Sequence, residues 1–261
     1  MTALLALAQL GRGVVPADEP ILRADDEGVL RGRAVFETLR VYGGRPFELD
    51  AHFDRLRASA ARLRLPAPPV AELQSLAHDA LAAAGVPDCA LRFLWTPETG
   101  LALVSALPPE LEELRARGLR LHVCEWATGA LAGAKSVSYA ENVIAQAVAE
   151  EHGSDDALLV APDGTVLEAP TANVWFREGD VLHTPTLELP ILAGVTRAVL
   201  VRGRSVEEGR YPLERLLAAD EVLLTSSVRE VMPVVRVGGR EFQRGPAAAE
   251  LQRSLRRYAG A

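Results

Sequence analysis

The chain has 261 residues, of which 49% are hydrophobic and 24% charged, so it can bury one large core or two modest ones. Its formal net charge of −7 argues against nucleic acid or an anionic membrane as its main partner, and Cys89 and Cys124 are too few for a disulfide framework or a structural zinc site. The histidines show no metal-ligand spacing, and the short apolar start is typical of a first strand or helix, not of a signal peptide or membrane span. We therefore expect a cytoplasmic protein without a metal centre.

The first part of the chain, residues 1–108, predicts a small α+β domain. Residues 35–49 read as two strands around a Gly-Gly turn, and an amphipathic helix follows with Asp50 as its expected cap. A second amphipathic helix ends at Gly85, and two strand-like runs complete this part. Residues 109–120 are expected to connect it to the rest of the chain.

The remaining residues, 121–261, predict a larger domain rich in antiparallel strands. After a first strand, Ser138 and Glu141 match the S-x-x-E capping box, which predicts a helix that starts just after Lys135. Two hairpins follow, with turns at Pro-Asp-Gly and Glu-Gly-Asp, and a helix begins at a Gly-x-Thr step. A strand that ends in hydroxyls, another hairpin and a closing helix complete a mixed α+β chain.

Lys135 is the single lysine among 28 Lys and Arg residues. Arginine stays protonated in proteins, whereas a desolvated lysine amine can lose its proton and attack a carbonyl to form a Schiff base. A lone lysine in an arginine-rich chain is therefore a candidate Schiff-base residue. A composition bias toward arginine would leave the same pattern.

An enzyme that uses pyridoxal 5′-phosphate needs two further parts beside such a lysine. An acid keeps the pyridine nitrogen protonated, and a cradle of arginine, hydroxyl and amide groups holds the phosphate. Taken singly, each candidate also has a plainer interpretation as a solvated acid, a helix-edge arginine, a capping hydroxyl or a turn serine. The candidates are Glu168 for the acid and Arg55, Val195, Thr196, Ser226 and Ser227 for the phosphate.

Their order along the chain points to one enzyme family. The stretches that carry it are VFETLRVYGGRPFELDAHFDRL, AKSVSYAENVIA, DGTVLEAPTANVWF, ILAGVTRAVL and TSSVREVMPV, which span about residues 32–234. Through them the chain resembles the class IV aminotransferases, the fold-type IV pyridoxal phosphate enzymes. This family includes branched-chain and D-amino-acid aminotransferases and aminodeoxychorismate lyases. The resemblance implies a small α+β domain followed by a larger, β-rich, barrel-like α/β domain that binds the cofactor.

The resemblance also implies a role for each site residue. Lys135 would form the Schiff base, Glu168 would pair with the pyridine nitrogen, and Leu192 would pack on the ring face. Asn173 would shape the site, and Tyr139 stands near the place of a tyrosine at the cofactor's phenolic oxygen, one residue closer to the lysine than in branched-chain members. The implied phosphate ligands are Arg55, Val195, Thr196 and Ser227, with Ser226 nearby. A homodimer is implied as well, in which the partner's small domain completes each active site.

The substrate-binding region departs from the family patterns. Arg92 precedes the loop WTPETG, but the Arg-x-His pair of D-amino-acid members, the Tyr-x-Arg pattern of branched-chain members and the Arg-Gly loop of lyases are missing. We expect a transaminase that moves an amino group between an amino acid, of either chirality, and a keto acid. The alternative is an aminodeoxychorismate lyase that releases pyruvate and 4-aminobenzoate. A cofactor-free scaffold is a third interpretation, which the full set of cofactor residues argues against.

Overall fold

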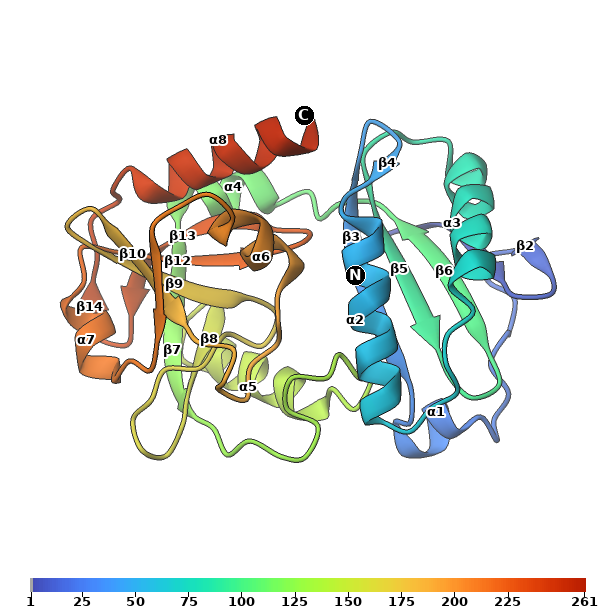
Figure 1. Ribbon diagram of the computed structural model, residues 1–261, viewed down its shortest axis with the longest axis horizontal. Coiled ribbons are helices and arrows are strands. Elements are labelled where there is room, and N and C mark those ends of the chain that lie inside the picture. The colour runs from blue at the N-terminus through green and yellow to red at the C-terminus, as the bar shows by residue number, and fades with distance from the viewer. Residues whose placement is uncertain (1) are drawn as a thin grey trace. The chain divides into compact units, whose positions relative to one another are not determined.

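The computed structural model describes residues 2–261, and these divide into two compact units (Figure 1). Unit 1 comprises the chain up to Pro108, the segment Ala134–Ser138 and the end of the chain from Ala259. Unit 2 comprises Pro109–Gly133 and Tyr139–Tyr258. Lys135 therefore belongs to unit 1, although the residues on both sides of its segment belong to unit 2. The expected mixed α+β architecture is confirmed.

Unit 1 is built on an antiparallel sheet with the strand order β2-β1-β6-β5-β3-β4. In β3 the side chains alternate, so that Val35, Leu39 and Val41 are fully buried while Thr38 and Arg40 lie half-buried on the other face. The strands are β1 (Leu4–Gln9), β2 (Gly13–Val15), β3 (Val35–Tyr42), β4 (Arg45–Pro46), β5 (Cys89–Trp95) and β6 (Gly100–Ser105).

Two helices, α2 (Leu49–Arg62) and α3 (Val70–Ala84), pack on one face of this sheet (Figure 1). Phe53 of α2 lies against Phe93 of β5, with ring centroids 4.8 Å apart. Helix α2 begins one residue before Asp50, with Glu48 in a left-handed conformation at the N-cap, so the prediction that Asp50 caps this helix is wrong. The Asp50 carboxylate instead lies in the first turn of α2, where its negative charge interacts favourably with the helix dipole. The short helix α1 (Glu27–Arg31) precedes β3.

Unit 2 is built on a mixed sheet with the strand order β11-β10-β9-β12-β13-β7-β8, and β14 pairs with β13. The pairs β10–β9, β9–β12 and β12–β13 are antiparallel, whereas β13–β7, β7–β8 and β10–β11 are parallel. The predicted hairpins over 173–185 and 231–242 are confirmed. The strands are β7 (Leu119–Glu125), β8 (Asp156–Val160), β9 (Asn173–Glu178), β10 (Val181–Pro185), β11 (Val206–Gly209), β12 (Glu221–Ser226), β13 (Glu230–Val237) and β14 (Arg240–Glu241).

The helices of unit 2 are α4 (Leu111–Arg117), α5 (Ala140–Glu151), α6 (Val195–Val201), α7 (Leu213–Ala218) and α8 (Ala247–Ala259). The closing helix α8, red in Figure 1, is bound to β13 through Glu230, whose side chain is fully buried. Gln252 Nε2 donates to Glu230 Oε2 at 2.7 Å, and Arg256 Nη2 donates to the same oxygen at 2.9 Å. Arg115 of α4 donates to it at 3.1 Å. These donors compensate the burial of the carboxylate.

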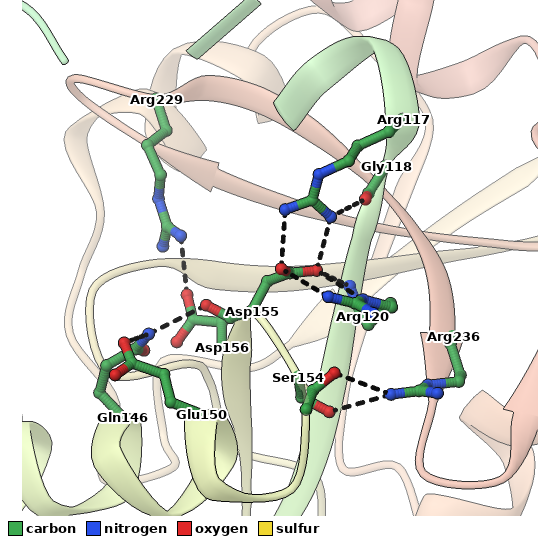
Figure 2. Close-up of polar contacts among 11 residues, drawn as sticks. Arg117, Gly118, Arg120, Gln146, Glu150, Ser154, Asp155, Asp156, Arg229 and Arg236 are labelled. Atoms are coloured by element: carbon green, nitrogen blue, oxygen red, sulfur yellow. Dashed lines mark hydrogen bonds and ion pairs between the residues drawn. The ribbon is translucent and has the colours of Figure 1, made fainter. Parts of the chain in front are cut away.

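Helix α5 joins the parallel strands β7 and β8, and Asp155 stabilises the end of this crossover. Figure 2 shows its carboxylate between Arg117 and Arg120, which donate at 2.8 Å and 3.2 Å. Partial burial would raise the pKa of Asp155, but the hydrogen bonds from Arg117 and Arg120 outweigh it and hold that pKa well below its usual range. The neighbouring Asp156 accepts from Arg229 at 2.7 Å. Lys135 lies in the same crossover, between β7 and α5.

Among the helices formed within residues 2–261, none is both long enough and apolar enough for a bilayer span. The same range contains no group of three or more His, Cys, Asp and Glu side chains arranged to hold a metal ion.

Candidate active site

The backbone around Lys135 pairs with the edge of β3. The Phe36 N–H donates to the Lys135 carbonyl oxygen at 3.0 Å, and Ser136 forms an antiparallel bridge with Val35. On the other side, the Lys135 N–H donates to Ser59 Oγ of α2 at 3.1 Å. Hydrogen bonds to the backbone of β3 and to a side chain of α2 therefore fix the backbone position from which the lysine side chain projects.

Helix α5 begins later than the S-x-x-E pattern predicts. Its N-cap is Tyr139, whose side chain makes no capping hydrogen bond. Ser138 Oγ, the expected cap, instead donates to the Gly32 carbonyl oxygen at 3.0 Å. The prediction of a capping box at Ser138 and Glu141 is therefore wrong, because the hydroxyl has a partner more than a hundred residues away that local spacing cannot reveal.

Unit 1 buries an ion pair around Arg55 that the sequence analysis missed. The fully buried Glu37 accepts from Arg55 Nε on one oxygen at 2.8 Å and from Arg55 Nη2 on the other at 2.7 Å. His52 Nδ1 lies 2.7 Å from the second oxygen. Burial alone would raise the pKa of Glu37, but the charge and hydrogen bonds of Arg55, with the hydrogen bond of His52, lower it to about 2. An acid at an inward position of β3, between Val35 and Leu39, is the signal that could have revealed this pair.

The opposite face of β3 gathers positive charge around Phe36. Lys135 Nζ lies 4.5 Å from the Phe36 ring centroid, and the Arg92 guanidinium carbon lies 5.1 Å from it. Arg92 stands opposite Thr38 in the register of β3 and β5, and its Nε donates to Thr38 Oγ1 at 3.0 Å. Two cations against one aromatic ring make this face attractive to an anion.

In unit 2, Glu168 is held by a loop and by an amide side chain. The Leu192 N–H lies 3.2 Å and 3.1 Å from its two carboxylate oxygens, and Asn173 Nδ2 donates to it at 3.3 Å. Asn173 Nδ2 also donates to the Leu192 carbonyl oxygen at 2.9 Å. A Cβ atom on Gly194 would lie 1.9 Å from Asn173 Oδ1, so only glycine allows this close approach. The structure thus brings Glu168, Asn173 and Leu192 together.

The predicted phosphate residues of unit 2 lie next to this group. Val195 and Thr196 begin helix α6 directly after Gly194, and Thr196 is buried. The N-cap residue of α6 is Gly194, which has no side chain that could accept hydrogen bonds from the first amides of the helix. The residue before Ser226 pairs with Asn173 across β12 and β9, which places Ser226 at the Asn173 end of these strands, and Ser227 follows in the turn.

Tyr139 is tied to the loop that follows Glu168. Its hydroxyl donates to the Pro170 carbonyl oxygen at 2.7 Å, and Asn142 Nδ2 donates to the same oxygen at 2.9 Å. Each unit thus assembles its own share of the predicted residues. Unit 1 holds Arg55 and Lys135, and unit 2 holds Tyr139, Glu168, Asn173, Leu192, Val195, Thr196, Ser226 and Ser227.

Comparison with known proteins gives a consistent result. The model of the family described as amino-transferase class IV matches residues 34–237. Aminodeoxychorismate lyase from Bacillus subtilis (strain 168) is 30% identical, over 90% of this chain and 88% of the lyase. The structure of the fold IV-transaminase CpuTA1 from Curtobacterium pusillum has a TM-score of 0.89 at 30% identity and covers 96% of this chain and 98% of that one. A hypothetical aminotransferase from Mycobacterium tuberculosis, with alpha-ketoglutarate and PMP bound, has a TM-score of 0.91 at 28% identity and covers 97% and 98%; it has also been solved in a PLP-bound form.

Proposed function

This chain belongs to the class IV aminotransferases, and on that premise we propose which of its residues hold pyridoxal 5′-phosphate and bind the substrate. The family uses this cofactor, and we propose that the protein is a transaminase that acts on amino acids and keto acids. The observation that carries the residue assignment is Lys135. It is the single lysine of the chain, and its backbone is held on both sides by hydrogen bonds.

The residues present fit the cofactor. Glu168 offers a half-buried carboxylate whose orientation is fixed by Leu192 and Asn173, as an acid that must face a ring nitrogen requires. Gly194 allows the close approach that shapes this site. We propose Lys135 for the covalent attachment, Glu168 for the ring nitrogen, Leu192 for the ring face, Asn173 and Tyr139 for the shape of the site, and Arg55, Val195, Thr196, Ser226 and Ser227 for the phosphate.

When bound, the cofactor supplies an aldehyde that takes up the amino group and a ring that withdraws electrons from the substrate. The protein supplies charge and proton transfer. A carboxylate at Glu168 would lie beside the ring nitrogen, and its negative charge would raise the pKa of that nitrogen. Lys135 Nζ accepts the proton of the substrate α-carbon and later returns a proton, the general-base and general-acid role that lysine can fill and arginine cannot.

We propose that Arg92 binds the carboxylate of the amino acid or keto acid. Support comes from its place against the same Phe36 ring as Lys135 and from its fixed Nε–Thr38 hydrogen bond. A guanidinium held in one orientation can pair with a carboxylate through two N–H groups. Arg92 would then bind the carboxylate in place of the Arg-x-His, Tyr-x-Arg and Arg-Gly patterns, which the sequence lacks.

Transaminase and lyase activity can be distinguished by their products and by the response of the cofactor to amino donors. Purified holoenzyme is mixed with a panel of D- and L-amino acids, and the absorbance bands of the aldehyde and amine forms of the cofactor are followed. A transaminase converts the cofactor to its amine form with at least one donor, and a keto acid reverses the change. Formation of 4-aminobenzoate and pyruvate from 4-amino-4-deoxychorismate, with no response to any amino donor, would establish the alternative that the Bacillus subtilis relative's name suggests.

We also propose that the protein is a homodimer. Apolar side chains are exposed on both units: Val29 and Leu30 on α1 at 54% and 63%, and Val143 and Ile144 on α5 at 60% and 61%. Contiguous exposed apolar patches mark interaction sites, and these neighbouring side chains support an interface at α1 and α5. Sedimentation velocity of wild type and of Ile144→Asp tests the proposal, and a monomeric wild type would contradict it. A cytoplasmic location, which the two free thiols favour, is proposed with it and is tested by cell fractionation.

A further inference from the structure

We infer that Glu37 is a positioning residue that orients Arg55 for the cofactor's phosphate, and that His52 holds Glu37 in place. The inference rests on the proposed function, because it takes Arg55 as a phosphate ligand. It concerns residues that neither the family resemblance nor the sequence patterns singled out.

The geometry of the Arg55–Glu37 pair fixes the guanidinium plane. Arg55 donates through Nε and Nη2 to the two oxygens of Glu37, at 2.8 Å and 2.7 Å. A guanidinium has five N–H hydrogens in one plane, and this two-point contact uses two of them. The other three, two on Nη1 and one on Nη2, then point in directions set by the pair. Arg55 is 11% exposed and Glu37 is 0% exposed, so the pair stands at the boundary between the core and the surface of unit 1.

The negative charge of Glu37 argues against the explanation that the Arg55–Glu37 pair favours phosphate binding through electrostatic attraction alone. A carboxylate next to the phosphate-binding arginine lowers the positive potential that a phosphate meets. If attraction alone set the affinity, removing the Glu37 charge would strengthen phosphate binding. If orientation sets it, removing the charge would weaken binding. The two interpretations therefore predict changes of opposite sign.

His52 is the second support of Glu37. A carboxylate only accepts hydrogen bonds, so the hydrogen on the ring must be on Nδ1, which lies 2.7 Å from Glu37 Oε2. Burial lowers the pKa of His52, and the nearby charges of Arg55 and Lys135 act in the same direction, against the hydrogen bond and charge of Glu37. The ring thus stays neutral and fixes Glu37 without a further positive charge. Its buried Nε2 has no hydrogen-bond partner within residues 2–261.

The decisive measurement compares two ligands that differ only in the phosphate. The full-length protein, stripped of cofactor, is titrated with pyridoxal 5′-phosphate and with pyridoxal, and binding is followed by absorbance. Glu37→Gln keeps the size of the side chain but places an amide where Arg55 needs an acceptor. We expect the Kd for pyridoxal phosphate to rise at least tenfold while the Kd for pyridoxal changes less than threefold. Asp54→Asn is the matched control. It removes an exposed acid next to Arg55 on α2 and should change neither of the two Kd values.

A double-mutant cycle tests whether Glu37 acts through Arg55. Arg55→Lys keeps the charge but loses the two-point contact, and the double variant should bind pyridoxal phosphate no more weakly than Arg55→Lys alone. Tighter or unchanged binding by Glu37→Gln, equal losses for both ligands, or additive losses would overturn the inference. If Glu37→Gln fails to fold in a thermal scan, Glu37→Asp takes its place, since it keeps the charge and withdraws the oxygens. A wild type with no preference for pyridoxal phosphate over pyridoxal would overturn the phosphate role of Arg55 itself.

Discussion

Replacing Glu168 by glutamine separates its charge from its hydrogen bonds. The Glu168 oxygens accept from the Leu192 N–H at 3.2 Å and 3.1 Å and from Asn173 Nδ2 at 3.3 Å. Glutamine keeps one acceptor oxygen for Leu192 and loses the other. The loss of one such hydrogen bond costs about 1 kcal/mol of folding free energy. Loss of the charge beside the ring nitrogen costs far more in catalysis, on the order of 10²–10³ in rate.

The assay is the half-reaction of the cofactor-saturated variant with its best amino donor, followed by stopped-flow absorbance. We expect bound cofactor, a melting temperature near that of wild type, and a rate lower by about two to three orders of magnitude. Glu141→Gln, an exposed acid in the first turn of α5, is the matched control and should keep the wild-type rate. A loss smaller than about threefold in Glu168→Gln would refute the role at the ring nitrogen and leave Glu168 a solvated acid.

Three further predictions concern other parts of the site. Lys135→Ala should abolish turnover and the absorbance of the attached cofactor, and borohydride should label one wild-type peptide, the one that contains Lys135; a label elsewhere would contradict the assignment. Gly194→Ala places a Cβ 1.9 Å from Asn173 Oδ1, so thermal unfolding should show a loss of about 1–3 kcal/mol and titration a weaker cofactor affinity, whereas Gly129→Ala, with open space around it, should change neither. Burial holds the pKa of His52 below 6.5, so the unfolded chain takes up a proton there first and the free energy of unfolding falls as the pH drops below 6.5. In urea titrations from pH 7 to pH 5, His52→Asn should show a shallower fall, by at most about 1.4 kcal/mol per pH unit, and an unchanged slope would show that His52 does not titrate as inferred.

Local patterns were enough for most of the secondary structure. The Gly-Gly turn after β3 predicted a hairpin, because both glycines adopt positive φ angles that other residues rarely reach. The end of α3 at Gly85 followed from the same preference. The capping box at Ser138 failed for the opposite reason: its hydroxyl is used by Gly32, and no local pattern reports a contact between distant segments.

The site shows the same division between local and distant information. Glu168 and Asn173 are only five residues apart in the chain, so the hydrogen bond between them is nearly a local contact. Glu37 was missed because a single acid in a strand is usually exposed, and its partners lie on the next helix. The arginine that we propose for the substrate carboxylate could not be identified from spacing either. Arg92 meets Phe36 only because β5 pairs with β3 across more than fifty residues of chain.

The pairing of the Lys135 segment with β3 has a consequence for how the protein is made. All strands of unit 1 have been synthesised once translation reaches Ser105. The edge of β3 at Val35 and Phe36 still lacks its pairing partner until Lys135 and Ser136 have been synthesised. An open strand edge is a site where chains pair with one another. A fragment that ends at Pro108 should therefore self-associate more than the intact chain does. The segment that covers this strand edge contains Lys135, the proposed attachment residue for the cofactor. The same folding step would therefore position the lysine and remove the open edge at which two chains could pair.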